Sequence, residues 1–244
     1  MSSTVVHCLA VSWLVCGLGL FARSRPSPQI NSSWNDWRSA TRTSTVDALS
    51  LELVMTELSG PARGQRAVTV WLMRPSSFRA EQILASGKYV RTYHRGVATI
   101  DGVAAPSAEA YDNIRRDAAH WLLLVLAEPT TRAQSTSSAP SDLATSAGTL
   151  EFQLDKIGRF IVEIDAKSSR VARLTYVPAA GLRSAGAAPH TIVDDVQSYQ
   201  SVDGVWIPRH IRRRDGDVSR LLELRSVRLN PGWTTAYFAQ HRSQ

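Results

Sequence analysis

Cysteine is nearly absent from this 244-residue chain. The only two cysteines, Cys8 and Cys16, lie in the first apolar stretch. If that stretch is removed, the remaining chain has no thiol, which excludes disulfide bonds, cysteine-ligated zinc and a thiol nucleophile. Lysine is also scarce, because only three of the 28 basic residues are lysine and the rest are arginine. This skew indicates genome composition rather than selection for a polyanionic partner, although the net charge is +7.

Catalytic signatures are missing as well. The sequence has no phosphate-binding loop, no dinucleotide fingerprint, no H-E-x-x-H and no G-x-S-x-G motif. Ser184 misses the nucleophile elbow by one residue, and the histidines have no metal-ligand spacing. Asp194 and Asp195 are adjacent, so on a strand their carboxylates point to opposite faces and cannot act as a catalytic pair. We therefore expect a non-enzymatic protein with no catalytic residues, no metal site and no cofactor.

A run of three arginines, Arg212 to Arg214, is the one feature that suggests nucleic acid. It lies beside Asp215 and Asp217 and has no stacking aromatic residues nearby. The pattern is typical of a solvated strand end, so no nucleic-acid partner is expected.

Only one long hydrophobic run occurs, over residues 8–22 (CLAVSWLVCGLGLFA), and it carries no charge. As a helix it would rise about 22 Å, short of the roughly 30 Å hydrocarbon core of a bilayer. That length is typical of a signal-peptide core, and Ala22 and Ser24 are small residues suited to cleavage after Ser24. We expect residues 1–24 to be a signal peptide and the protein to be periplasmic. An uncleaved membrane anchor and a wrongly assigned start codon are the alternatives.

The segment that follows differs from the rest of the chain. Residues 23–33 contain two prolines and four serines, which is typical of a tether. Trp34 and Trp37 are three apart and suggest a short helix. Residues 25–46 are therefore predicted to be a tether with a possible short N-terminal helix, and residues 47–244 to be one folded domain.

From Asp47 onward the apolar residues recur with period two, the pattern of half-buried strands. Short turns separate these segments, so neighbouring strands must be antiparallel. The pattern predicts about ten strands, over residues 47–56, 66–74, 78–84, 89–95, 149–155, 159–165, 170–177, 191–199, 205–213 and 218–229.

One segment has helical spacing instead. Between Ser107 and Glu128 the apolar residues recur every three or four positions, Ser107 can cap the helix and Pro129 ends it. The last two turns are apolar all round, so this end of the helix should be buried. Residues 130–148 are rich in Ser, Thr and Ala and are predicted to be a mobile loop. A single antiparallel sheet of this size should curl, and this helix is the element long enough to cover its apolar face.

Two adjacent motifs, Val70–Phe78 (VWLMRPSSF) and Ser86–Tyr93 (SGKYVRTY), resemble the periplasmic outer-membrane lipoprotein carrier (LolA-like) family. Tyr199–Pro208 (YQSVDGVWIP), Val227–Pro231 and Phe238 resemble the ending of outer-membrane lipoprotein-sorting relatives. The resemblance covers roughly residues 47–238. It departs from the carriers at Ser86, where they have Asp, and at Arg91, where they have an aromatic residue.

The resemblance implies a mainly β fold, an incomplete (half) antiparallel β-barrel of about ten strands with a helical lid over its concave face. In the carriers the arginine of the Arg-Pro motif bonds to the lid, and Arg74 occupies that position. The implied lipid-binding residues are Val68, Val70, Leu72 and Trp121, with Phe78 at the cavity mouth. The alternatives are a strand-end arginine in water for Arg74 and a filled core without ligand for the valines and leucine.

The resemblance further implies an exported, non-enzymatic, carrier-like protein that binds lipid or lipoprotein acyl chains in a hydrophobic cavity. The alternative is an envelope-sensing interaction module of the same fold, similar to regulators of anti-sigma factors. Lipid or lipoprotein acyl chains are the expected partners, with envelope proteins as further partners, and the protein is expected to be a monomer.

The uncharged run over residues 8–22 leads to a direct prediction about export. N-terminal sequencing of the protein from a cell-envelope fraction should give a chain that starts near Arg25, because cleavage is expected after Ser24. Recovery of the intact chain, beginning at Met1, from the cytosol would contradict export.

Overall fold

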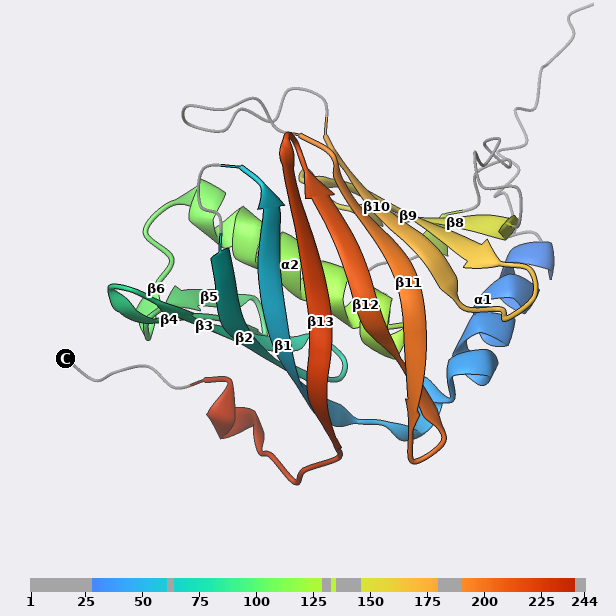
Figure 1. Cartoon of the computed structure of the whole chain (residues 1–244), viewed down its shortest axis with the longest axis horizontal. Coiled ribbons are helices and arrows are strands. Elements are labelled where there is room, and N and C mark those ends of the chain that lie inside the picture. The colour runs from blue at the N-terminus through green and yellow to red at the C-terminus, as the bar shows by residue number, and fades with distance from the viewer. Residues whose placement is uncertain (1–27, 61–63, 129–132, 135–145, 180–189, 240–244) are drawn as a thin grey trace, which may run out of the picture.

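The computed structural model describes residues 28–60, 64–128, 133–134, 146–179 and 190–239. In this part of the chain thirteen strands form one antiparallel sheet, and two α-helices pack with it (Figure 1). The helices are α1 (Pro28–Thr41) and α2 (Ala108–Leu126), and short 3-10 helices cover Thr43–Thr45 and Thr235–Tyr237. The strands are β1 (Ala48–Ser59), β2 (Gly64–Met73), β3 (Ser77–Leu84), β4 (Gly87–His94), β5 (Val97–Ile100), β6 (Val103–Ala104), β7 (Ala133–Gln134), β8 (Ser146–Leu154), β9 (Gly158–Asp165), β10 (Val171–Pro178), β11 (Ile192–Val202), β12 (Val205–Asp215) and β13 (Val218–Leu229).

The order of the strands across the sheet is β6-β5-β4-β3-β2-β1-β13-β12-β11-β10-β9-β8-β7. Each strand pairs with its sequence neighbour except where β1 pairs with β13, which joins the first half of the chain to the second. β6 and β7 lie at the two edges, so the described sheet is curled but not closed. The mainly β, open half-barrel expected from the sequence is confirmed.

All ten predicted strands are present, with ends that differ by a few residues. The sheet also contains β5, β6 and β7, which were not predicted because segments of two to four residues are too short to show a period. β7 and the start of β8 fall inside residues 130–148, which were predicted to be a loop. The other residues of that predicted loop lie outside the described part of the chain.

Helix α2 lies against one face of the sheet and crosses the strands diagonally (Figure 1). Ser107 caps it as predicted, because its Oγ accepts a hydrogen bond from the Ala110 N–H at 3.1 Å. At the other end Ala127 adopts a left-handed conformation with φ of 48°, which ends the helix. Every residue from Ala118 to Leu126 is buried, which confirms that the apolar end of the helix lies inside the half-barrel.

Helix α1 is longer than the short helix suggested by the two tryptophans. It begins at Pro28, inside the stretch predicted to be a tether, because proline is tolerated in the first turn of a helix. Trp37 is buried, and Trp34 packs edge-on against Trp37 and against Phe152 of β8. These ring contacts fasten α1 to the β8 side of the sheet. Residues 1–24, the predicted signal peptide, lie outside the described residues.

The inner face of the sheet is built from alternate residues. Leu49, Leu51 and Leu53 of β1 are at most 3% exposed, and their partners on β2 and β13 are also largely apolar. Together with α2 they form the main core. Among the described helices none is long and apolar enough to span a membrane.

Candidate functional site

The residues expected to bind lipid all lie in the core between α2 and the inner face of the sheet. Val68, Val70 and Leu72 point to this face from β2 and are 5%, 0% and 0% exposed. Trp121 of α2 is 5% exposed and belongs to the same core, with its ring 5.5 Å from the Arg213 guanidinium of β12. Phe78 of β3 was expected at a cavity mouth. Its side chain is fully buried, and it lies directly opposite Leu72 of β2 in the sheet. In this arrangement the helix occupies the apolar face on which an acyl chain was expected to lie.

Arg74 fastens the C-terminal end of α2 to the rest of the molecule. Its Nη2 donates to the Leu126 carbonyl at 2.8 Å and to the Thr43 carbonyl at 3.0 Å, its Nε donates to the Val46 carbonyl at 2.9 Å, and its Nη1 pairs with Glu128. The last carbonyls of a helix lack partners within the helix, and a cation there also complements the helix dipole. With a side chain only 15% exposed, Arg74 is not an arginine free in water.

A second ion pair joins the middle of α2 to the sheet. Arg91 of β4 pairs with Asp117 of α2, and Asp117 also accepts a hydrogen bond from Arg116 Nη2 at 2.9 Å. Burial alone would raise the pKa of Asp117, but Arg91 and Arg116 outweigh it and hold this pKa well below its usual range. Arg91 thus makes a charged contact to the helix from the inner face of the sheet.

A third polar contact is buried deeper and involves His120, Asp194 and Arg213. Asp194 of β11 is 0% exposed, and its two carboxylate oxygens accept from Arg213 Nε at 2.8 Å and Nη2 at 2.7 Å. His120 of α2 places its Nε2 2.7 Å from Asp194 Oδ2 and 2.9 Å from Arg213 Nη2. The sequence spacing of 74 residues between histidine and aspartate contains no motif that would reveal this cluster.

The proton on His120 decides which of these two contacts is a hydrogen bond. A protonated Nε2 donates to the Asp194 carboxylate, whereas an unprotonated Nε2 accepts from the Arg213 guanidinium, and it cannot do both. Burial and the Arg213 charge lower the pKa of His120, although Asp194 opposes them. Burial would raise the pKa of Asp194, but Arg213 and His120 hold it well below its usual range.

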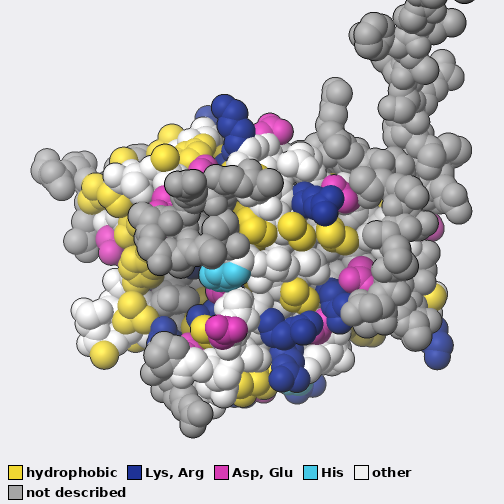
Figure 2. Space-filling view, turned by 90° about the horizontal axis from the view of Figure 1, so that it is seen from above, with side chains coloured by type: hydrophobic (Ala, Val, Ile, Leu, Met, Phe, Trp, Pro, Cys, Tyr) yellow, Lys and Arg dark blue, Asp and Glu magenta, His cyan; other side chains and the backbone are white. Residues whose placement is uncertain are grey.

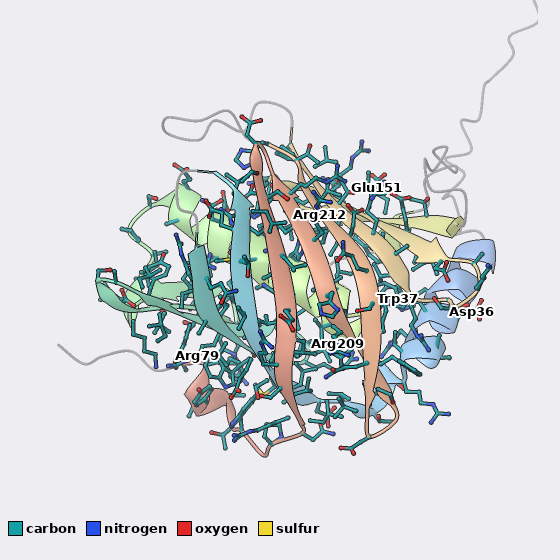
Figure 3. The ribbon with its side chains drawn as sticks, viewed as in Figure 1. Asp36, Trp37, Arg79, Glu151, Arg209 and Arg212 are labelled. Carbon is teal, nitrogen blue, oxygen red and sulfur yellow. The ribbon has the colours of Figure 1, made fainter. Side chains whose placement is uncertain are left out.

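The sequence suggested that the arginine run of β12 is a solvated strand end. In the structure only part of the run is solvated. Arg212 is exposed on the outer face (Figure 3) and Arg214 is half exposed, whereas the side chain of Arg213 points inward and is 18% exposed. The alternation of Asp194 and Asp195 is as expected, because Asp195 pairs with Arg173 and Arg214 rather than with the inner cluster.

No protein-family model and no curated protein matches this sequence. Solved structures do match. A LolA superfamily protein from Nitrosomonas europaea has a TM-score of 0.59 at 10% identity, over 86% of this chain and 96% of that one. The chain has the LolA-like fold.

Two other solved structures agree with the LolA-like fold. A DUF1329 family protein from Desulfovibrio piger has a TM-score of 0.54 at 11% identity and covers 86% of this chain and 96% of that one. A domain from Vibrio parahaemolyticus, described as outer membrane lipoprotein-sorting, has a TM-score of 0.50 at 10% identity and covers 86% and 97%. At these identities the similarity concerns the fold.

The described parts of the chain were also compared with the metal-site and nucleophile expectations from the sequence. There, no group of three His, Cys, Asp or Glu side chains lies close enough together to hold a metal ion. Ser184, the near-match to a nucleophile elbow, lies outside the described residues. The three polar contacts described above, around Arg74, Arg91 and Arg213, connect α2 to the sheet.

The lowered pKa of His120 makes stability depend on pH. Below about pH 6.5 the unfolded chain takes up a proton at this position that the folded protein resists, so the free energy of unfolding falls as the pH falls. A His120→Gln variant should therefore lose less stability between pH 7 and pH 5 than the wild type in urea titrations. The depressed pKa values of Asp117 and Asp194 act at lower pH, below about 4.

His94 provides the comparison, because burial and Arg95 also lower its pKa. A His94→Gln variant should lose only the part of the pH dependence of unfolding that His94 contributes. The part contributed by His120 should remain. An unchanged pH dependence in His120→Gln would contradict the account of the buried cluster.

Proposed function

We propose that this chain is an exported, non-enzymatic protein that binds acyl chains of lipids or lipoproteins between α2 and the inner face of the sheet. It would act as a carrier in the periplasm and as a monomer. The observation that carries the proposal is the set of contacts by which Arg74 holds the end of α2. The LolA-like fold and the apolar face beneath the helix support it.

The buried face suits an exchange between helix and acyl chain. Val70 and Leu72 belong to the same core as the buried apolar side chains of α2, and an acyl chain would offer the sheet a similar surface. An acyl chain that takes the place of α2 restores most of the apolar contacts that the sheet loses. The free energy of the exchange therefore depends mainly on the polar contacts of the helix. Val68, Val70 and Leu72 would then serve as core in the empty protein and as lining in the loaded one.

Polar contacts are well suited to hold such a lid reversibly. A hydrogen bond that involves a charged group contributes about 1.5–3 kcal/mol, enough to favour the closed position without fixing it. Arg74 makes its contacts at the very end of α2, where Ala127 already terminates the helix. In the proposed mechanism this end separates from the sheet when lipid enters.

The face of the molecule seen in Figure 2 does not have the charge pattern of a polyanion-binding surface. In Figure 2 the described side chains on this face form hydrophobic strips with Lys, Arg, Asp and Glu set between them. A nucleic-acid-binding surface would gather positive charge along one stripe.

Replacement of Arg74 tests the proposed lid. Arg74→Leu removes the hydrogen bond to Leu126 and the pairing with Glu128, so the closed, empty state loses stability relative to the open one. A fluorescent fatty acid should therefore bind more tightly, by up to about 10- to 100-fold. Fluorescence titration of both proteins measures the change.

Arg79 provides a matched control. It lies on the outer face of β3, the side of the sheet opposite to α2, where it bonds to Glu81 and to the Tyr237 carbonyl (Figure 3). Arg79→Leu should leave the affinity unchanged. Unchanged or weaker binding in Arg74→Leu, or a natively purified wild-type protein whose organic extract contains no acyl lipid by mass spectrometry, would contradict the proposal.

A further inference from the structure

Arg91 is a charged residue in an otherwise apolar row on the inner face of the sheet. Directly paired residues on neighbouring strands share a face, and the pairing runs from Leu51 through Val70 and Ala80 to Arg91 and then Ile100. Leu51, Val70 and Ala80 are at most 3% exposed, and Ile100 packs against the core. The Arg91 side chain is only 23% exposed, and a cation so largely withdrawn from water is more stable with a partner.

The partner comes only from the helix. Among the described residues the one carboxylate that pairs with Arg91 is Asp117 of α2, and the Arg91 guanidinium otherwise lies near the ring of Tyr89. Two other arginines that reach α2 from this face differ. Arg213 is paired with Asp194, which is on the sheet itself, and Arg74 keeps its bonds to the carbonyls of Thr43 and Val46 if α2 moves.

Displacement of α2 therefore leaves one specific charge without compensation. The guanidinium of Arg91 would then face an apolar row that leads across β3 and β2 to β1, a distance of about 14 Å at the usual strand spacing. Arginine binds carboxylate and phosphate groups through paired hydrogen bonds, so an anionic head would satisfy it where Asp117 had been.

We propose that Asp117 stands in for the head group of the ligand, and that the protein selects anionic amphiphiles whose carboxylate or phosphate binds Arg91 while the acyl chain lies along Ala80, Val70 and Leu51. This rests on the proposed binding of acyl chains and adds the chemical class of the ligand. The charge on Arg91 then serves both states, as a contact for the closed helix and as the recognition group for the head of the ligand.

The test compares ligands of one chain length that differ in the head group. Laurate, dodecyl phosphate and dodecanol are titrated against the wild type, and the readout is the ratio of the dodecanol dissociation constant to that of each anion. We expect a ratio of about 10 to 100 for at least one anion, because the neutral head leaves Arg91 without its partner. The two anions separate a carboxylate ligand from a phosphate ligand.

Variants separate recognition of the head group from release of the helix. Arg91→Gln should bring the ratio close to one, whereas Asp117→Asn should tighten binding of all three ligands and keep the ratio, since it only weakens the closed state. Arg225→Gln, on the exposed outer side of β13, should change neither quantity. Should Arg91→Gln not fold, Arg91→Lys should retain the preference for anions in weakened form.

Each outcome is decisive. Binding of all ligands with a wild-type ratio near one, or with a high ratio that persists in Arg91→Gln, would overturn the role of Arg91 and leave acyl-chain binding intact. Binding of no ligand at all to the wild type would contradict the proposed function itself, and the inference would fail with it.

Discussion

Burial of α2 against the inner face of the sheet is the interaction on which the rest of the structure depends. An antiparallel sheet with one apolar face is stable only when that face is covered. Here the strands from both halves of the chain meet at β1 and β13, and a single helix covers the surface they form. The nine residues from Ala118 to Leu126 are all buried, so separation of helix and sheet requires another apolar group in its place.

The polar contacts under α2 come from widely separated parts of the sheet. Arg74 follows β2, Arg91 belongs to β4 and Arg213 to β12, and each reaches a group on or at the end of the helix. Removal of one partner from a buried charge pair is strongly unfavourable, because the remaining charge is left without compensation. In the proposed mechanism these contacts keep the lid closed when the protein is empty. A ligand that displaces the helix must make contacts that compensate for those lost.

Local patterns were enough to predict ten strands of the sheet and helix α2. Alternation along Leu49, Leu51 and Leu53 predicted the first strand, and the Ser107 cap with its amphipathic segment predicted α2. The full length of α1 was not predicted, because the prolines and serines near its start are typical of a tether. The helix is stabilised by the contact of Trp34 with Phe152, which is distant in the sequence. Such contacts are set by the tertiary fold.

The polar contacts of the site were predictable only in part. Arg74 was found through a motif, and its contact with the helix end is present. The cluster of His120, Asp194 and Arg213 was missed because alternation separates Asp194 from Asp195 but does not say which of them faces the core. Arg91 was noted as a departure from the carriers, yet its partner Asp117 lies 26 residues away on another element. Pairing across elements is not visible in a local pattern.

Photochemical cross-linking with a fatty acid that carries a diazirine on its chain tests the central claim most directly. The claim is that the acyl chain lies between α2 and the inner face, and β2 gives it a clear signature because alternate residues face opposite sides. Peptide mapping by mass spectrometry should find label on Val68, Val70 and Leu72 and none on Thr69 and Trp71. Label on Thr69 and Trp71, or equally on both sets, would contradict binding under the helix.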